Sequence, residues 1–445
     1  MKQAVRWVFV MALLVHGVYL VSLYAGFLNP LFINASRFKR KGQGQAADFF
    51  VFYSSACRLA RGESIYRAQS AETPYMYGRY KYLPFFVFTI IWLALLPPWS
   101  AYVAWLLLIE GALAFAILLA LRWNKRQGRP FSPWLAAALF IVPTPLYLEM
   151  YMGQNTFLFA VLVMMFLYCV ARGGRRIAAF VSYVLSAVLK MGSLLYIPVL
   201  LRRKAFAFVA LGLVVLLVPN LVYFVLIDRS SVRVRFAPKN KVEQATTQAK
   251  PGKKLKMPMV KFDRRPGEMK ELAAPFTAEV KMPTGVYYFL QHVLRTPGSL
   301  YYPSVCGFSS LFYCLTKSIP AFKLWAVALW LVVFAVLIWR PGAPLLDFSL
   351  IIAAFFLSHT FAWEHHYTLI YPLIILCIMR FPRQGWFFWP AFVLVALPTP
   401  FIFFNQLLIS NPLYYLPKSL GVVLFFAGLV VVKIRCWRDG TPGKG

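Results

Sequence analysis

Long apolar segments follow one another along most of the chain, and this succession restricts the folds open to it. A helix needs about 20 apolar residues to cross a bilayer core of about 30 Å. Twelve segments are candidates: 5–29, 83–98, 99–122, 133–149, 156–171, 177–200, 205–227, 322–339, 345–361, 366–380, 386–407 and 413–434. Four of them, which begin at residues 83, 133, 156 and 366, are short, as is typical of helices that are tilted, re-entrant or broken around a cavity. The sequence predicts an all-α polytopic membrane protein with about 12 transmembrane helices.

The composition excludes most other classes of protein. Of the 445 residues, 60% are hydrophobic and only 14% are charged. Soluble domains are nearer half apolar and a quarter charged, so a soluble enzyme, a disordered chain and a coiled coil are excluded. The formal net charge is +33, from 47 Lys and Arg against 14 Asp and Glu. In a chain that buries most of its length in lipid, this excess favours anionic membrane lipids or lipid-linked phosphates as partners, and not nucleic acid.

The positions of the basic residues predict an orientation in the membrane. Lys2 and Arg6 precede the first apolar segment, and no small-residue cleavage site follows it, so the segment indicates a retained helix and not a signal peptide. With the N-terminus in the cytoplasm, the basic turn at 202–204 also lies inside, as the positive-inside rule requires. Residues 30–82 and 228–321 then lie outside. We expect a multi-pass protein of the cell (inner or plasma) membrane.

This orientation divides the chain into three regions. Residues 1–227 form a transmembrane module that includes the first outer loop, residues 228–321 form a second outer loop, and residues 322–445 form a C-terminal transmembrane module. Helical spacing from Phe49 to Ala60 predicts a short interfacial helix in the first outer loop. The stretch 229–282 carries fourteen basic residues against five acids, and we expect either a mobile insertion that binds phosphate-rich surfaces or a solvated loop.

Carboxylates are scarce, which makes the search for a catalytic acid or base short. Six of the fourteen acids lie in the basic insertion or in the C-terminal tail. The others are Asp48, Glu63, Glu72, Glu110, Glu149, Asp228, Asp347 and Glu364. An ionisable residue at membrane depth is energetically costly and is a functional candidate for that reason. Asp48 is our first candidate, because it lies at the outer boundary where the predicted interfacial helix begins, although a helix N-cap is the alternative role.

Three of the five histidines fall within eight residues, at His359, His365 and His366. Under the predicted topology they face the same side as Asp48. Adjacent positions on a helix point about 100° apart, so these side chains converge on a metal only if the helix breaks. We therefore favour a neutral histidine that takes or gives a proton over a metal site.

One lysine and two amides complete the set of candidates. Lys190 lies deep in the segment 177–200, where its side chain reaches an interface only with difficulty, and a cation in a lipid-facing cavity suits a lipid phosphate. Gln154 and Asn155 precede the segment 156–171. Their amides are suited to hydrogen-bond sugar hydroxyls, while a cap at Asn155 is the structural alternative.

Together these motifs resemble glycosyltransferase family 87, the polyprenyl-phosphate-mannose-dependent α-(1,2)-mannosyltransferases of the GT-C fold. The resemblance rests on the acidic motif at 48–53, the Tyr and Pro residues at 80–84, the block formed by 153–155 with Leu189 and Lys190, and the late motif Trp363-Glu364-His365-His366. Two features depart from the family pattern. Met191 and Gly192 follow the lysine where a proline is usual, and the basic insertion has no match.

The resemblance implies a GT-C-type bundle with an outward-facing active site between the first loop and the bundle. Such enzymes pass a sugar, here a hexose such as mannose, from a polyprenyl monophosphate to a lipid-linked or cell-envelope glycan acceptor with inversion. It implies Asp48 as the catalytic base, with His366 and His365 sharing the proton or orienting the acceptor.

The remaining polar residues near these motifs receive binding roles. For the donor phosphate we assign Lys190, Lys81 and Arg79. For the sugar and the acceptor we assign Gln154, Asn155, Tyr82, Glu364 and Tyr53. The lipid-linked donor is a co-substrate and carries no diphosphate, so we expect neither a cofactor nor a metal.

A lipid or glycolipid transporter is the main alternative, because it also needs a basic cavity in a helical bundle. The sequence shows no internal repeat, and Asp48 is placed at an outer rim and not at the membrane midplane. Both observations favour the enzyme.

Overall fold

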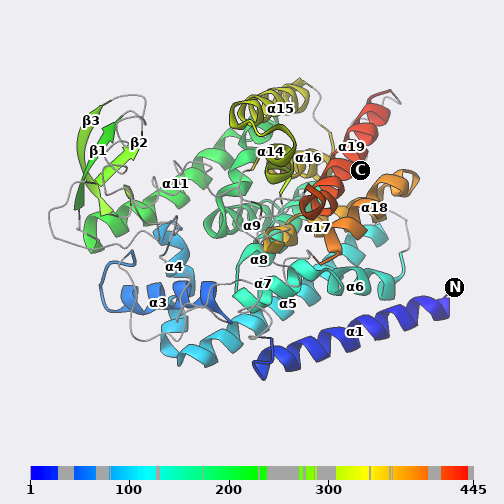
Figure 1. Ribbon diagram of the computed structural model, residues 1–445, viewed down its shortest axis with the longest axis horizontal. Helices are drawn as coiled ribbons and strands as arrows, with labels where there is room; N and C mark the ends of the chain where they lie inside the picture. Colours follow the sequence, from blue (N-terminus) through cyan, green and yellow to red (C-terminus); the bar gives the residue numbers. More distant parts are fainter. Residues whose placement is uncertain are drawn as a thin grey trace, which may run out of the picture.

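The computed structural model describes residues 2–28, 45–66, 80, 82–126, 131–173, 175–228, 231–237, 270–273, 277–284, 286–287, 307–339, 342–359, 362, 364–398 and 412–438. Within these ranges the protein is mostly helical, with one small sheet at one end (Figure 1).

In this part of the chain, five helices are long and apolar enough to cross a membrane, or six if one bent pair counts as a single span. The five are α1 (Lys2–Tyr24), α5 (Pro98–Arg126), α11 (Phe206–Val222) with its π-helical continuation η3 (Tyr223–Ile227), α15 (Ile319–Trp339) and α19 (Pro412–Arg438). The structure therefore does not show the predicted count of about 12 spans, although it supports a membrane protein with several of them.

The other apolar segments are helical but shorter. They form α4 (Pro84–Ile90), η1 (Ile91–Leu95), α6 (Pro133–Ile141), α7 (Thr144–Met152), α8 (Thr156–Arg172), α9 (Arg176–Leu189), η2 (Met191–Tyr196), α10 (Ile197–Arg202), α16 (Pro344–Ser358), α17 (Ile370–Arg380) and α18 (Gly385–Ala396). Short connecting elements are α14 (Phe308–Thr316), η4 (Glu364–Thr368) and η5 (Pro382–Gln384). The pair α6 and α7 bends by 51°. The bend falls at Pro143, which has no N–H to continue α6 and is itself extended, with φ −61° and ψ 125°.

The helix predicted in the first outer loop is present as α3 (Ala47–Ala60), but it is an internal element and not an interfacial one. Eleven of its 14 residues are buried. It contacts α4, η1, α5 and α7, and the Phe49 ring packs against the Tyr102 and Trp105 rings of α5. Because large apolar side chains occupy all its faces, full burial removes more apolar surface from water than contact with one side of a membrane surface would.

A three-stranded sheet corrects the all-α expectation. Strand β1 (Ser231–Ala237) lies between β2 (Lys270–Ala273), to which it is parallel, and β3 (Ala278–Pro283), to which it is antiparallel. The first strand alternates Val with Arg, which is the period-two pattern of a strand with two unlike faces. Both ends of the basic insertion are therefore paired strands, and the insertion's residues 238–269 lie outside the described part of the chain.

The core lies where short central helices pack together, and this places the candidate site. Ten of the 11 residues of α17 and 13 of the 15 residues of α16 are buried. By contrast, α1 runs along one edge of the molecule with most of its apolar side chains exposed (Figure 1). The interruptions between α7 and α8 and between α9 and η2 fall near this core, and η4 contacts both α7 and α8.

Candidate functional site

Asp48 and Gln154 are in direct contact. Asp48 is half-buried in the first turn of α3, and Gln154 is buried in the turn between α7 and α8. Gln154 Nε2 donates a hydrogen bond to Asp48 Oδ2 at 2.5 Å. The N-cap of α3 is Ala46 and not Asp48, so the alternative role proposed for this carboxylate is not the one that the structure gives it.

A glycine allows α3 to pack directly on this turn. Gly153 has a left-handed φ of 67°, and a Cβ added to it would lie 2.4 Å from Phe49 Cβ. The Ala46 N–H donates to the Tyr151 carbonyl at 2.8 Å, which fixes the start of α3 against the end of α7. Close backbone approach of this kind requires glycine. The local sequence therefore sets the position of the neighbouring Asp48.

Tyr82 and Trp105 hold the two oxygen atoms of Gln154, one in its side chain and one in its backbone. The Tyr82 hydroxyl donates to Gln154 Oε1 at 3.5 Å, and Trp105 Nε1 donates to the Gln154 carbonyl at 3.2 Å. Burial, and then the negative charges of Asp48 and Glu149, raise the pKa of Tyr82, so its phenol is a neutral donor. With its oxygen accepting from Tyr82, the Gln154 amide presents its N–H to Asp48.

Lys190 lies at a break in the helical path. The residue is extended, with φ −152° and ψ 127°, between the end of α9 and the start of η2. Lys190 Nζ donates to Thr156 Oγ1 at 2.6 Å, and its charge interacts with the carboxylates of Glu149 and Asp48. This is its one hydrogen bond to the described residues, and an ammonium has three donors. A half-buried cation with donors to spare is suited to bind an anionic group.

Asn155 is a buried residue that supports the break between α9 and η2 at Lys190. Its side chain is fully buried, and Nδ2 donates to the Leu189 carbonyl at 3.3 Å. It occupies the N-cap position of α8 without capping it through its side chain. Its Oδ1 has no hydrogen-bond partner among the described residues. This amide supports the backbone at Lys190 in the structure, because it is fully buried and its nitrogen bonds to the Leu189 carbonyl.

Glu149 is the residue that the sequence reasoning left unassigned. It is fully buried, and its Oε1 accepts from the Phe157 N–H at 2.8 Å, which caps the start of α8. Its Oε2 lies 3.3 Å from Thr368 Oγ1. The sequence did contain a sign of its importance, because burying an acid in an apolar segment is energetically costly. In the structure, the positive charge of Lys190 acts on this carboxylate.

The two adjacent histidines lie on η4. His365 is buried and His366 is half-buried, with their ring centroids 4.5 Å apart. His359 stacks on Phe355 and lies 6.3 Å from the His366 ring. Burial, and then the positive charge of Lys190, lower the pKa of His365, so its imidazole is neutral. The charge of Lys190 thus interacts with Asp48, with Glu149 and with His365 of the histidine pair.

One comparison with known protein families gives a match. The family model of glycosyltransferase family 87 matches residues 80–251. Over this range, which is less than half of the chain, the sequence is similar to glycosyltransferase family 87. The matched range contains Glu149, Gln154 and Lys190, whereas Asp48 and the histidines lie outside it. No curated protein matches the chain. With its membrane-length helices, the protein is a membrane glycosyltransferase.

Two other side chains assigned to the sugar in this glycosyltransferase bond to protein groups. Glu364 is buried on η4, and its Oε1 accepts from Lys418 Nζ at 2.7 Å and from Thr144 Oγ1 at 3.2 Å. The Tyr53 hydroxyl donates to the Leu96 carbonyl at 2.7 Å, at the end of η1. Both contacts join segments distant in sequence, and no local pattern predicts such partners.

Two candidate phosphate ligands, Lys81 and Arg79, lie outside the described residues, and Trp363 of the late motif does too. Among the residues that are described, no group of three or more His, Cys, Asp or Glu is suited to hold a metal. Metal-independent transfer stays a prediction.

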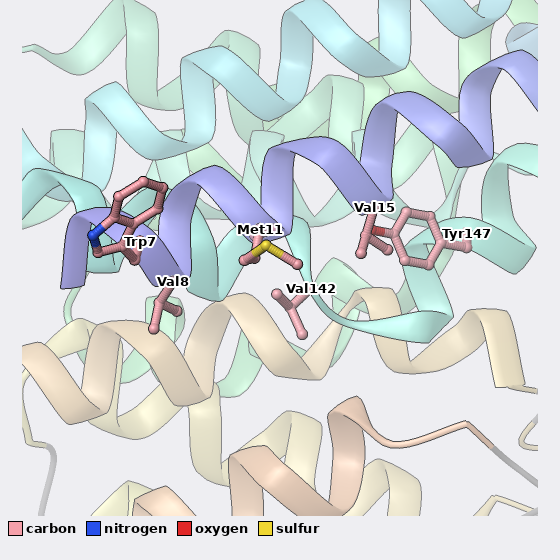
Figure 2. A pocket seen from close by; sticks show the side chains of 7 residues that line it. Trp7, Val8, Met11, Val15, Val142 and Tyr147 are labelled. Carbon is pink, nitrogen blue, oxygen red and sulfur yellow. The ribbon is translucent and has the colours of Figure 1, made fainter. Parts of the chain in front are cut away.

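An apolar groove of about 450 Å³ on the glycosyltransferase lies apart from these polar residues. Figure 2 shows it between α1 and the bend of α6 and α7, with Trp7, Val8, Met11 and Val15 facing Val142 and Tyr147. Its lining has neither a carboxylate nor a cation. The groove therefore offers no charged group for proton transfer or for phosphate binding.

Proposed function

We propose that this glycosyltransferase moves a hexose, with mannose as the first candidate, from a polyprenyl monophosphate to a lipid-linked or cell-envelope glycan acceptor. One observation supports this proposal above the others. A half-buried carboxylate and a half-buried ammonium meet at the turn between α7 and α8, through the Asp48–Gln154 and Lys190–Thr156 hydrogen bonds. We place the reaction in an outward-facing cavity on the extracytoplasmic side of the membrane.

The acceptor hydroxyl must lose a proton as its oxygen attacks the anomeric carbon. In our proposal Asp48 takes this proton, and the Gln154 amide holds the carboxylate in position. The new C–O bond forms on the face opposite the phosphate, so the anomeric configuration inverts. His366 is more exposed than His365, and we assign it the orientation of the acceptor, with His365 behind it.

The bond between the anomeric carbon and the phosphate oxygen breaks in the same step, and the electron pair leaves with the polyprenyl phosphate. Lys190 is placed to stabilise this charge, because its contact with Thr156 leaves two N–H donors for phosphate oxygens. Glu149 offsets the cost of holding the lysine charged before the donor binds. Among the candidate sugar ligands, we place Tyr82 and Gln154 at the hexose.

A transfer assay with the purified protein in lipid nanodiscs tests the proposal. Asp48→Asn removes the base and keeps the side-chain volume, so turnover falls by about 10²- to 10⁴-fold. Near wild-type transfer by this variant would contradict the assignment of the base. Addition of a chelator leaves transfer unchanged, and loss of activity that Mg²⁺ or Mn²⁺ restores would contradict metal independence.

Two measurements identify the substrates and separate the enzyme from a transporter. Mass spectrometry of lipids that co-purify with the protein is expected to show a polyprenyl monophosphate bearing one hexose. Radiolabelled sugar is expected in a new glycolipid, whereas a transporter would move the same lipid between leaflets. The match to a glycosyltransferase family favours the first outcome.

A further inference from the structure

A second buried lysine, Lys418 of α19, lies beneath the histidine segment. The residue is 2% exposed, and its Nζ lies 2.7 Å from Glu364 Oε1. It also donates to the carbonyl oxygens of Val395 at 2.5 Å and Leu397 at 2.6 Å. An ammonium has three donors, and these three oxygens use all of them. Lys418 therefore differs from Lys190, because it has no donor to offer to a phosphate.

These contacts join three parts of the chain at one point. Val395 and Leu397 lie at the C-terminal end of α18, where carbonyl groups have no helical partner and favour a cation. Glu364 is the first residue of η4, and Lys418 Nζ also lies 5.3 Å from the centre of the Tyr367 ring in the same turn. The ammonium thus contacts η4 at two positions, on either side of His365 and His366.

The histidine turn also packs against α7, α8 and α17, and the contacts of its two end residues fix its position. It is a single 3₁₀ turn of five residues, and such a turn is not stable by its own hydrogen bonds. Thr144 Oγ1 supports the Glu364 carboxylate at 3.2 Å, and Thr368 supports the far end through Glu149. Removal of the Lys418 charge takes away the ammonium that lies 2.7 Å from the buried Glu364 carboxylate, which is costly unless the turn moves or the carboxylate is protonated.

We propose that Lys418 is a positioning residue that holds the His365–His366 pair at the active site through its ion pair with Glu364. This inference rests on the proposed function of the histidine pair and extends the site to the last helix, outside the range that matches the family. Lys418 touches neither substrate. It fixes the turn on which the acceptor-orienting group stands.

The variant that tests this role is Lys418→Met, which keeps the length of the side chain and removes the charge. Its matched control is Lys433→Met, on the same helix. Lys433 forms an ion pair of the same length, 2.7 Å, with the fully buried Asp347, which also lies 3.5 Å from Arg203, and no hydrogen bond or ion pair joins Lys433 to η4 in the described structure. Both variants lose one buried cation. A fall in activity of equal size in both therefore reports lower stability, and not a role of Lys418 in positioning the histidines.

Steady-state kinetics of the full chain in nanodiscs supply the first readout. A displacement of about 1 Å in an active site costs about 100-fold in rate, so Lys418→Met lowers kcat by about that factor with little change in the donor KM. The control keeps kcat within about threefold. The double variant Lys418→Met with Glu364→Gln is no slower than Lys418→Met alone, because the unpaired carboxylate is also removed. Equal losses in Lys418→Met and the control, or a change confined to KM, would overturn the proposal.

Hydrogen exchange of η4 supplies a readout that needs no activity. The Leu369 N–H donates to the His366 carbonyl at 3.0 Å, and its exchange speeds by at least about tenfold in Lys418→Met and not in the control. If Lys418→Met fails to fold, the same comparison is made with Glu364→Gln. Wild-type protein without any transfer from polyprenyl-phosphate sugars would overturn the proposed function and leave the exchange result standing. Active protein with unchanged kcat and exchange in Lys418→Met would overturn this inference alone.

Discussion

The Gln154 amide nitrogen lies 2.5 Å from Asp48 Oδ2, although the two residues are 106 positions apart in the chain. The contact joins the first loop to the interruption between α7 and α8. The same interruption carries Thr156, which holds Lys190 at 2.6 Å. One turn of the backbone therefore positions both charges that the proposed reaction requires.

Gln154→Leu tests whether this contact matters for catalysis. A hydrogen bond to a charged group contributes about 1.5–3 kcal/mol, so loss of the amide lowers kcat/KM by about 10- to 100-fold. The measurement is transfer from the polyprenyl donor in nanodiscs. Gln384→Leu is the control, because Gln384 is also buried but lies in η5. Equal activity in the two variants would show that Gln154 is a structural residue only.

Gly153→Ala tests the close packing of α3 on the turn. The new Cβ would lie 2.4 Å from Phe49 Cβ, and the left-handed φ of 67° is unfavourable for alanine. We expect a loss of about 2–4 kcal/mol in stability, from backbone strain and overpacking together, and a fall in activity as Asp48 shifts.

Gly62→Ala is the control for strain, because Gly62 has a φ of 69° with nothing within 4 Å of the added Cβ. It loses about 1–2 kcal/mol and keeps its activity. Thermal unfolding of both variants at one scan rate in one detergent measures the difference. If the two variants unfold at the same temperature, the contact between α3 and the turn is not tight.

The helical segments were predictable from the sequence, and their breaks were not. An apolar run identifies a buried helix, but the extended conformation of Lys190 depends on Thr156 and on the Asn155 contact with Leu189. A hydropathy pattern carries no information about such bonds. The same holds for α3, which the sequence predicts as a helix while its partners in α5 decide that it is internal.

Scarcity made part of the site predictable. Because acids are few, Asp48 could be selected by elimination, and the isolated Lys190 likewise. Selecting candidates by their scarcity identifies single residues, but it does not show which residue each of them contacts. Glu149 was one of eight candidate acids, and only the structure shows that the Lys190 charge acts on it. The sequence likewise gave no sign that Glu364 pairs with Lys418 of α19. The strands were missed for a different reason. The insertion was interpreted as a loop because of its basic composition, although Val and Arg alternate at its start.

Charge balance between Glu149 and Lys190 gives a prediction on stability. Lys190→Met removes a positive charge that acts on the fully buried Glu149, so we expect the variant to be less stable than the wild type. The double variant with Glu149→Gln recovers part of this loss while transfer stays low, because the phosphate-binding cation is still absent. Thermal unfolding and transfer are measured on the same samples. A double variant less stable than Lys190→Met would contradict the pairing.

The pH dependence of stability reports on His365. Burial, and then Lys190, lower the pKa of this imidazole in the folded protein, while an unfolded histidine titrates near 6.5. Below about pH 6.5 the unfolded chain therefore binds a proton that the folded protein does not, and stability falls as the pH falls. The slope from this one group approaches 1.4 kcal/mol per pH unit, a limit set by the one proton involved.

His365→Asn removes that proton, so its unfolding temperature changes less than that of the wild type between pH 7 and pH 5. His366→Asn is the comparison, because the half-buried His366 keeps access to water. Unfolding is followed in one detergent at matched ionic strength, and the difference between variants cancels the contribution of the carboxylates. Parallel curves for the wild type and His365→Asn would show that the pKa of His365 is the same in the folded and the unfolded protein, and would contradict the neutral imidazole that its place behind His366 requires.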